Sequence, residues 1–313
     1  MLKYILRRAL YTIPIAIGVS LVVFTLIHLA PGDPLSAVVG EADQKLLAEM
    51  RASFGYDKPL PVQYFLWLGS TLTGNMGYSL RTGAPVFPTL ISAAKNTIAI
   101  GIGAALLGFL FGVVSGLIAG YHHGTWIDKA VSSTAIAGVS MPHYWLAIIL
   151  VIIFSVHLGW LPSVGSGSGE SFWSWASWRH MVLPVIALAA IPGAIVARTA
   201  RAAVMEILNM EFVEALRARG LSERRILWHV ARNALPTVLA VMGLQFAHLL
   251  GGSILVETVF TWPGTGHLLN MAIFDRDMPV LQGTIMLLAL FFVLSNLVVD
   301  ILQAWADPRI SRS

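Results

Sequence analysis

The sequence predicts an all-α integral membrane protein with six transmembrane helices. Its mean hydropathy is +0.76, and 57% of its 313 residues are apolar while only 12% are charged. Soluble globular proteins carry about 25% charged residues, roughly twice this fraction. The apolar residues are also gathered into long blocks, and a soluble core does not require such blocks.

Six apolar blocks follow one another along the chain. Residues 97–120, for example, run for 24 residues without a charged side chain. A helix of that length, at roughly 1.5 Å per residue, crosses a hydrocarbon core about 30 Å thick. The six expected transmembrane helices are residues 9–30, 97–120, 130–158, 181–197, 237–260 and 280–302. We therefore expect two units: residues 1–96, with the first helix and a long outer segment, and residues 97–313, with a five-helix core.

The amino terminus has features of a signal peptide, because Lys3, Arg7 and Arg8 precede an apolar run. That run is longer than a usual signal-peptide core, and it ends at Pro31 and Pro34, which disfavour cleavage. We interpret it as the first transmembrane helix.

The distribution of basic residues predicts the orientation. With the amino terminus inside, the inner segments hold thirteen Lys and Arg residues, and the longer outer segments hold seven. Because Lys and Arg favour the cytoplasmic side, both termini are expected in the cytoplasm. The inner segments are residues 1–8, 121–129, 198–236 and 303–313. We therefore interpret the net charge of +4 as a topology signal more than as a sign of nucleic-acid binding.

The outer segments contain two recognisable patterns. Apolar residues recur at helical spacing between Leu46 and Phe54, which predicts a short amphipathic helix on the membrane surface. A second outer segment carries a Gly-Ser tract at residues 165–169, followed by tryptophans. Tryptophan favours the membrane interface, so an anchoring belt is expected from Trp160, Trp173, Trp175 and Trp178.

Glycines and prolines predict how the helices pack. Small residues at every fourth position form one helix face and let another backbone approach closely. This helix-packing role is expected for Gly108, Gly112, Gly116 and Gly120. Proline is expected to interrupt the third helix at Pro142 and the fourth at Pro184 and Pro192, as happens in bundles that line a cavity.

Polar residues inside the expected helices are candidates for a translocation path. Gln245 and His248 share one face of the fifth helix, and Asn296 and Asp300 share one face of the sixth. Intramembrane polar groups are costly unless they meet a partner or water, so two interpretations stay open: a solute path and interhelical hydrogen bonding. Glu257 and Asp300 lie near helix ends, where water is expected to be close, so neither needs to carry protons.

The inner segment 198–236 predicts a helix, a glycine turn and a second helix. Asn209 is expected to cap the first helix, whose first turn holds Glu211. Gly220 is expected to end it in a left-handed conformation. Ser222 then starts the second helix, and Pro236 is expected to mark its junction with the fifth transmembrane helix. A short surface helix with small side chains beside charges is suited to docking against another protein.

Several chemistries find no support in the sequence. It contains no cysteine, which excludes disulfides and thiol chemistry. We find no phosphate-binding loop, no zinc-protease motif and no nucleophile-elbow motif, so no catalytic or metal-binding residues are expected. His122 and His123 adjoin a short inner loop and are expected at the surface.

The segment around Glu214, Gly220 and Pro236 resembles the EAA loop of binding-protein-dependent ABC importer permeases. The stretch from Gly220 to Pro236 is similar to the dipeptide, oligopeptide and nickel subfamily, and other stretches agree along nearly the whole chain. These are Gly32-Asp33-Pro34, Gly77-Tyr78-Ser79, Ser140-Met141-Pro142, residues 257–266 and Asp307-Pro308-Arg309. Two departures exist, because Leu216 replaces the second alanine of the general motif and Pro236 lies three residues late.

The resemblance implies a permease of the type I importer fold, in a bacterial inner membrane. It implies a second homologous permease, two cytoplasmic ATPases that use ATP and magnesium, and a solute-binding protein. No cofactor is expected on this chain, and no nucleic acid is expected as a partner. Coupling to the ATPases is implied for Glu211, Phe212, Glu214, Ala215, Ala218, Gly220, Leu235 and Pro236.

The cargo is left open. Peptides are favoured, with nickel or another small solute as the alternative. A secondary transporter is a remoter alternative, since we see neither an internal repeat nor a mid-membrane acid.

Overall fold

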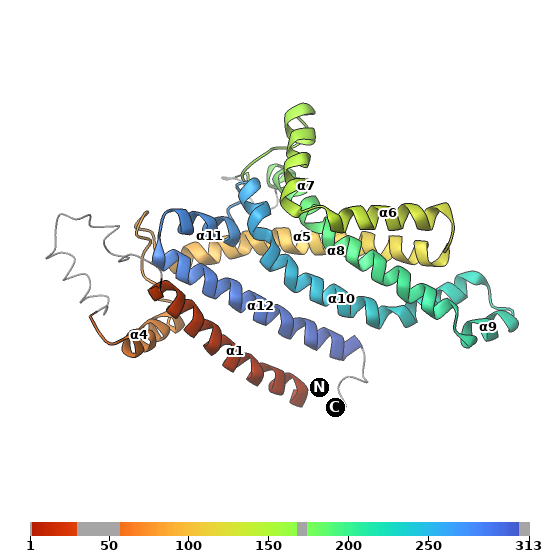
Figure 1. Ribbon diagram of the computed structural model, residues 1–313, viewed down its shortest axis with the longest axis horizontal. Coiled ribbons are helices and arrows are strands. Elements are labelled where there is room, and N and C mark those ends of the chain that lie inside the picture. The colour runs from red at the N-terminus through yellow and green to blue at the C-terminus, as the bar shows by residue number, and fades with distance from the viewer. Residues whose placement is uncertain (1, 30–56, 168–173, 307–313) are drawn as a thin grey trace.

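The computed structural model describes residues 2–29, 57–167 and 174–306, and regular secondary structure in these ranges is helical (Figure 1). The predicted all-α class is confirmed. The amphipathic helix expected near Leu46 falls outside the described residues. In chain order the helices are α1 (Leu2–Leu29), α4 (Leu60–Leu72), α5 (Val86–Tyr121), α6 (Trp126–Ser140), α7 (His143–Leu150), the π-helix η1 (Val151–His157), α8 (Trp175–Leu208), α9 (Glu211–Ala218), α10 (Glu223–Val259), α11 (Thr265–Phe274) and α12 (Met278–Ala306).

The long helices α5, α8, α10 and α12 run along the long axis of the molecule (Figure 1). One end carries α9 and the turn between α5 and α6, and we call it the α9 end. The opposite end carries α4 and α11, and we call it the α11 end. The start of α1 and the end of α12 both point toward the α9 end (Figure 1).

Four helices of the described chain are long and apolar enough to cross a membrane by themselves. They lie in α5, α8, α10 and α12, and the bent pair formed by α6 and α7–η1 counts as a fifth. In α1 the apolar part detected among the described residues is the shorter stretch Leu10–Thr25. The described residues therefore directly support four to five membrane-spanning helices, whereas the sequence predicts six.

The third expected helix is broken at Met141 and Pro142. Its two halves meet at 103°, so α7 and η1 leave the side of the molecule (Figure 1). Met141 has φ −91° and ψ 122°, an extended backbone that ends α6. A residue before proline is pushed out of the helical region by the proline ring, which explains a sharp break at this position.

The fourth expected helix, in contrast, is continuous, so the expected interruption there is wrong. Pro184 and Pro192 lie inside the 34-residue helix α8. Both prolines are buried. Proline removes one helical hydrogen bond, but within a bundle neighbouring groups accommodate this loss.

Helices α5 and α8 pack closely against each other. Four glycines of α5 lie against α8, and a Cβ atom on any of them would come within 3.0 Å of an α8 atom. For three of them the nearest atom is a backbone carbonyl oxygen. The glycines are Gly108, Gly112, Gly116 and Gly120, and the three carbonyls belong to Ala189, Gly193 and Ala197.

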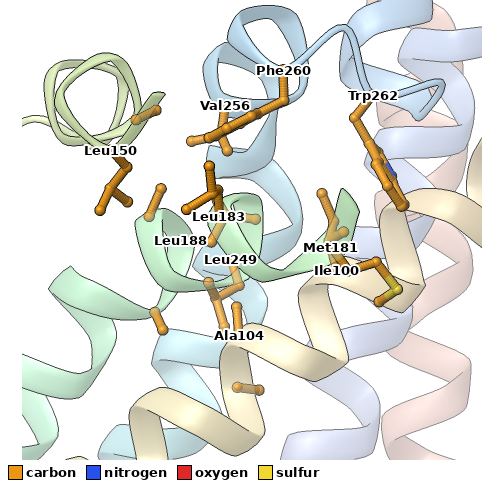
Figure 2. Close-up of a cluster of buried hydrophobic side chains, with 14 residues drawn as sticks. Ile100, Ala104, Leu150, Met181, Leu183, Leu188, Leu249, Val256, Phe260 and Trp262 are labelled. Carbon is orange, nitrogen blue, oxygen red and sulfur yellow. The ribbon is translucent and has the colours of Figure 1, made fainter. Parts of the chain in front are cut away.

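An apolar core fills the bundle toward the α11 end (Figure 2). It joins α5, α7, α8 and α10 and includes Ile100, Leu150, Leu188, Phe260 and Trp262. Trp262 and Phe260 are among the largest fully buried side chains. This core holds α7, the part of the broken helix that follows the bend, against the three long helices.

Candidate functional site

The loop between α8 and α10 forms the helix, glycine turn and helix expected from the sequence. The first helix, α9, runs from Glu211 to Ala218. Its N-cap is Met210, and Asn209 is instead the C-cap of α8, so the expected capping by Asn209 is wrong. Because α8 ends at Leu208 and α9 begins at Glu211, only two residues lie between the helices. Asn209 caps the end of α8, and Met210 caps the start of α9. Ser222 is the N-cap of α10, without a side-chain capping bond.

One face of α9 is anchored and the other is exposed. Val213 is fully buried in a cluster with Val204 and Ile207 of α8 and with Ile226 and Val230 of α10. This cluster holds α9 on the ends of its neighbours. The exposed positions include the candidate residues Glu211, Phe212, Glu214, Ala215 and Ala218.

Gly220 ends α9 in a Schellman motif. Its φ is +77°, in the left-handed region that only glycine enters without strain. The Gly220 N–H donates to the Arg217 carbonyl at 2.9 Å, and the Leu221 N–H donates to the Leu216 carbonyl at 3.2 Å. Leu216 and Leu221 both pack on the buried cluster beneath α9. The glycine therefore sets the angle at which α10 begins.

Leu235 and Pro236 lie inside α10, which is one helix of 37 residues. The expected junction at Pro236 is therefore wrong, and the fifth transmembrane helix continues directly into the loop. Both residues are exposed. One continuous helix thus joins the loop to the α11 end.

Glu223, in the first turn of α10, joins three elements at the α9 end. Its carboxyl group accepts a hydrogen bond from the Tyr121 hydroxyl of α5 at 2.9 Å and one from Arg217 Nε of α9 at 3.2 Å. No local pattern predicts this contact, because Tyr121 and Glu223 are 102 residues apart.

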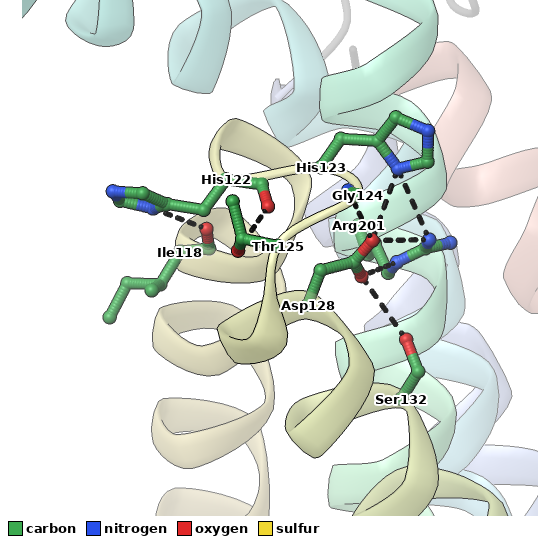
Figure 3. A network of polar contacts seen from close by, with 8 residues as sticks. All are labelled: Ile118, His122, His123, Gly124, Thr125, Asp128, Ser132 and Arg201. Carbon is green, nitrogen blue, oxygen red and sulfur yellow. Dashed lines mark hydrogen bonds and ion pairs between the residues drawn. The ribbon is translucent and has the colours of Figure 1, made fainter.

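A second polar network joins α6 to α8 (Figure 3). Asp128, in the first turn of α6, is 3% exposed. Its carboxylate accepts bonds from Arg201 Nε at 2.5 Å and from Arg201 Nη2 at 3.0 Å. The Gly124 N–H also donates to it at 3.0 Å, and His123 Nδ1 lies at 3.1 Å. His122, in contrast, is exposed and bonds to its own helix.

The α11 end is held by Glu257, which sequence reasoning placed near water. The structure shows the opposite, since Glu257 is 0% exposed. Its Oε1 accepts from the Thr97 hydroxyl at 2.8 Å, and its Oε2 accepts from the Gly266 and His267 N–H groups at 2.6 and 3.1 Å. Glu257 thus caps the start of α11, whose first N–H groups have no partner within the helix. The motif at residues 257–266 has an architectural explanation: it folds α11 onto α5 and α10.

Two further contacts secure this end. The Ser79 hydroxyl and the Leu80 N–H donate to Asp277, which precedes α12. Burial lowers the pKa of His267, whose Nδ1 is buried without a hydrogen-bond partner among the described residues. The lowered pKa favours the neutral form of this imidazole. The segment around Ser79, α11 and the start of α12 form one fastened unit.

The candidate path residues fall in different environments. Gln245 is buried in α10, whereas His248 on the same helix is exposed. Asn296 is half-buried on α12, and the side chain of Asp300 lies outside the described part of the chain. Gln245, His248 and Asn296 thus differ in their exposure. No group of three or more His, Asp or Glu residues suited to a metal ion is found among the described residues.

Comparison with known proteins identifies the family. The model of the binding-protein-dependent transport system inner membrane component matches residues 108–312, and the model of its N-terminal part matches residues 1–101. The chain is 38% identical to the dipeptide transport system permease protein of Alkalihalophilus pseudofirmus, over 99% of both chains. It is 40% identical to the di/tripeptide transport system permease protein of Pseudomonas aeruginosa, again over 99% of both. It is 39% identical to the glutathione transport system permease protein of Escherichia coli, with the same coverage. The chain therefore belongs to the family of binding-protein-dependent transport system inner membrane components, and it is a multi-pass protein of the inner membrane.

Proposed function

We propose that this chain is a permease subunit of an ATP-driven ABC importer that carries short peptides. The observation behind this proposal is the full-length similarity, at 38–40% identity, to permeases of dipeptide, di/tripeptide and glutathione transport. The cargoes in these names share one chemistry, since all are short chains with amide bonds and charged ends. A short peptide is therefore the cargo we assign.

The importer we propose contains four kinds of subunit. This chain pairs with a second homologous permease, two cytoplasmic ATPases bind below them, and a binding protein delivers the solute. ATP and Mg²⁺ belong to the ATPases, because this sequence has no phosphate-binding loop.

We assign ATPase coupling to α9 and the start of α10. The exposed face of α9 carries small and acidic side chains, and the buried cluster beneath it fixes the helix to α8 and α10. The docking residues we propose are Glu211, Phe212, Glu214, Ala215 and Ala218, with Gly220 setting the angle and Leu235 and Pro236 on the adjoining helix. Gln245, His248, Asn296 and Asp300 are kept as path candidates.

The topology we propose has six spans with both termini in the cytoplasm, in the type I importer fold. α1 has 28 residues, which at roughly 1.5 Å per residue is long enough to cross the hydrocarbon core. The start of α1 and the end of α12 lie toward the α9 end, which supports a common side for both termini (Figure 1). In this topology the α9 end is cytoplasmic.

Thiol labelling tests the topology. Because the chain has no cysteine, Thr82→Cys and Ser222→Cys each supply a single thiol, and both positions are exposed. We expect Thr82→Cys to react with an impermeant thiol reagent on intact cells, and Ser222→Cys to react only after the membrane is opened. Labelling of both from one side would contradict the six-span topology.

Uptake by the reconstituted complex tests the function. We expect proteoliposomes that hold the complex and its binding protein to accumulate labelled alanyl-alanine. This uptake should occur only when ATP is present on the side of the membrane that the ATPase subunits face. Glutathione serves as the second peptide probe. Uptake that follows an ion gradient without ATP would instead identify a secondary transporter, and uptake of nickel alone would overturn the peptide assignment.

Variants of the loop test the coupling role. Gly220→Val forces a branched side chain into a positive φ, at a strain of about 1–3 kcal/mol, and is expected to lower transport by roughly tenfold or more. No atom lies within 4 Å of a Cβ at this position, so the effect is one of backbone angle and not of collision. Gly220→Asn is the matched control, because asparagine tolerates this conformation.

Glu214→Lys reverses the charge of the docking face and is expected to weaken ATPase capture without changing permease abundance. If Gly220→Val and Glu214→Lys both capture the ATPase and transport at wild-type levels, α9 is not the coupling element.

A further inference from the structure

The helix α6 has few buried contacts along its length. Its buried residues are Asp128 and Ala135, and the others are half-buried or exposed. An apolar groove with a volume of about 720 Å³ runs between α5, α6 and α8, lined by residues such as Phe111, Thr134 and Ala190. The groove separates much of α6 from α5. Asp128 is therefore the one charged side chain that α6 buries.

Asp128 supplies a largely buried ionic contact between α6 and α8. The guanidinium of Arg201 binds both of its carboxylate oxygens and so forms a bidentate ion pair (Figure 3). The side chains of Asp128 and Arg201 are 5% and 27% exposed. The Glu223–Arg217 pair at the same end is 53% and 47% exposed, and such open pairs hold structures weakly. The buried pair is the firmer of the two links.

Arg201 lies on the part of α8 that leads into the coupling loop, by which we mean α9 and the start of α10. Its backbone carbonyl lies against Gly120 at the end of α5. Val204, less than one turn further along, is buried in the cluster that holds Val213 of α9. Val204 thus links the α8 segment that carries Arg201 to the buried cluster beneath α9.

The other end of α6 leads directly into the break at Met141 and Pro142. Ser140 is the last residue of α6, and the 103° bend to α7 and η1 follows it. Close contact between α6 and α8 near this end is made by Gly138, where a Cβ would lie 3.1 Å from Ala194. A helix held at one end by an ion pair and joined at the other to a bend can transmit motion along its axis.

We propose that Asp128 and Arg201 form a clamp that makes α6 move with the coupling loop, so that motion of α9 reaches the bend at Pro142. The proposal rests on the proposed function, because it presupposes an ATPase that moves α9. Asp128 and Arg201 are positioning residues in this scheme, since they act through α6 and need not touch the solute.

Transport stoichiometry in the full complex is the first test. Asp128→Asn keeps an acceptor for Gly124 but removes the charge, and Arg201→Gln removes the opposite charge. We expect each to raise the ATP hydrolysed per alanyl-alanine imported by roughly tenfold, with the double variant no worse than the worse single one. Glu206→Gln is the matched control, because it changes an exposed acid five residues further along α8. If either single variant does not assemble, Arg201→Lys replaces it in the same assay. Lysine keeps the positive charge but cannot bind both carboxylate oxygens of Asp128 as the guanidinium does.

A distance measurement separates a clamp from a merely stabilising pair. Spin labels on Ser133→Cys and Glu206→Cys report the separation of α6 from the end of α8 that leads into α9, and both positions are exposed. In the wild-type background we expect one narrow distance distribution, shared by the nucleotide-free and nucleotide-trapped complexes. With Asp128→Asn we expect the trapped state to shift or broaden it.

An unchanged stoichiometry together with an unchanged distribution in the variants would overturn the clamp. A wild-type complex that imports without ATP would overturn the proposed function instead. The two failures are therefore distinguishable.

Discussion

Replacing Glu257 by leucine is expected to destabilise the α11 end by roughly 3 kcal/mol or more. Leucine leaves the Gly266 and His267 N–H groups without the carboxyl oxygen that they share, and it removes the carboxyl partner of the Thr97 hydroxyl. A buried donor that loses its partner costs about 1–3 kcal/mol, and at least two such donors are left. The start of α11 should therefore detach from α5 and α10.

The measurement is the apparent midpoint of thermal unfolding of the purified permease, with limited proteolysis to locate the opening. Glu206→Leu is the matched control, because it makes the same chemical change at an exposed glutamate. Glu257→Gln should fall between wild type and Glu257→Leu, since the amide keeps one acceptor oxygen. If Glu257→Leu unfolds with the wild-type midpoint, the attachment of α11 does not depend on this carboxyl group.

Gly116→Ala is expected to cost about 1–3 kcal/mol, the usual range for overpacking, although it adds only a methyl group. The added carbon would collide with the Ala197 carbonyl and the Ala200 side chain of α8. A backbone carbonyl cannot turn away as a flexible side chain can, so α5 and α8 must separate. In an exposed helix the same substitution stabilises by up to about 1 kcal/mol, because alanine favours helices.

Gly251→Ala provides that comparison. Gly251 also lies in a long apolar helix, but a Cβ there would meet nothing within 4 Å. We expect its unfolding midpoint to equal or exceed that of wild type, while Gly116→Ala falls below it. Equal midpoints for the two variants would mean that the α5–α8 contact is loose enough to admit a methyl group.

The features that the sequence determined are those with a local cause. The apolar blocks predicted long helices because a run without charges can be stable only in lipid or in a core. The positive φ of Gly220 followed from glycine's freedom at a helix end, and the break before Pro142 followed from the constraint that proline places on its neighbour. The four glycines of α5 were recognised by their spacing, which puts them on one face whatever lies opposite.

The tertiary structure decided which groups meet across the chain. Glu257 and Thr97 are separated by 160 residues, and Arg201 and Asp128 by 73. No local pattern indicates such pairs, because each depends on how α5, α8 and α10 pack. For the same reason Pro236 looked like a helix boundary and lies within a helix, and Glu257 looked close to water and is buried. Local chemistry limits what each segment can do, and packing selects the partner that stabilises a buried polar group, since no single segment can supply both sides of a hydrogen bond that spans the bundle.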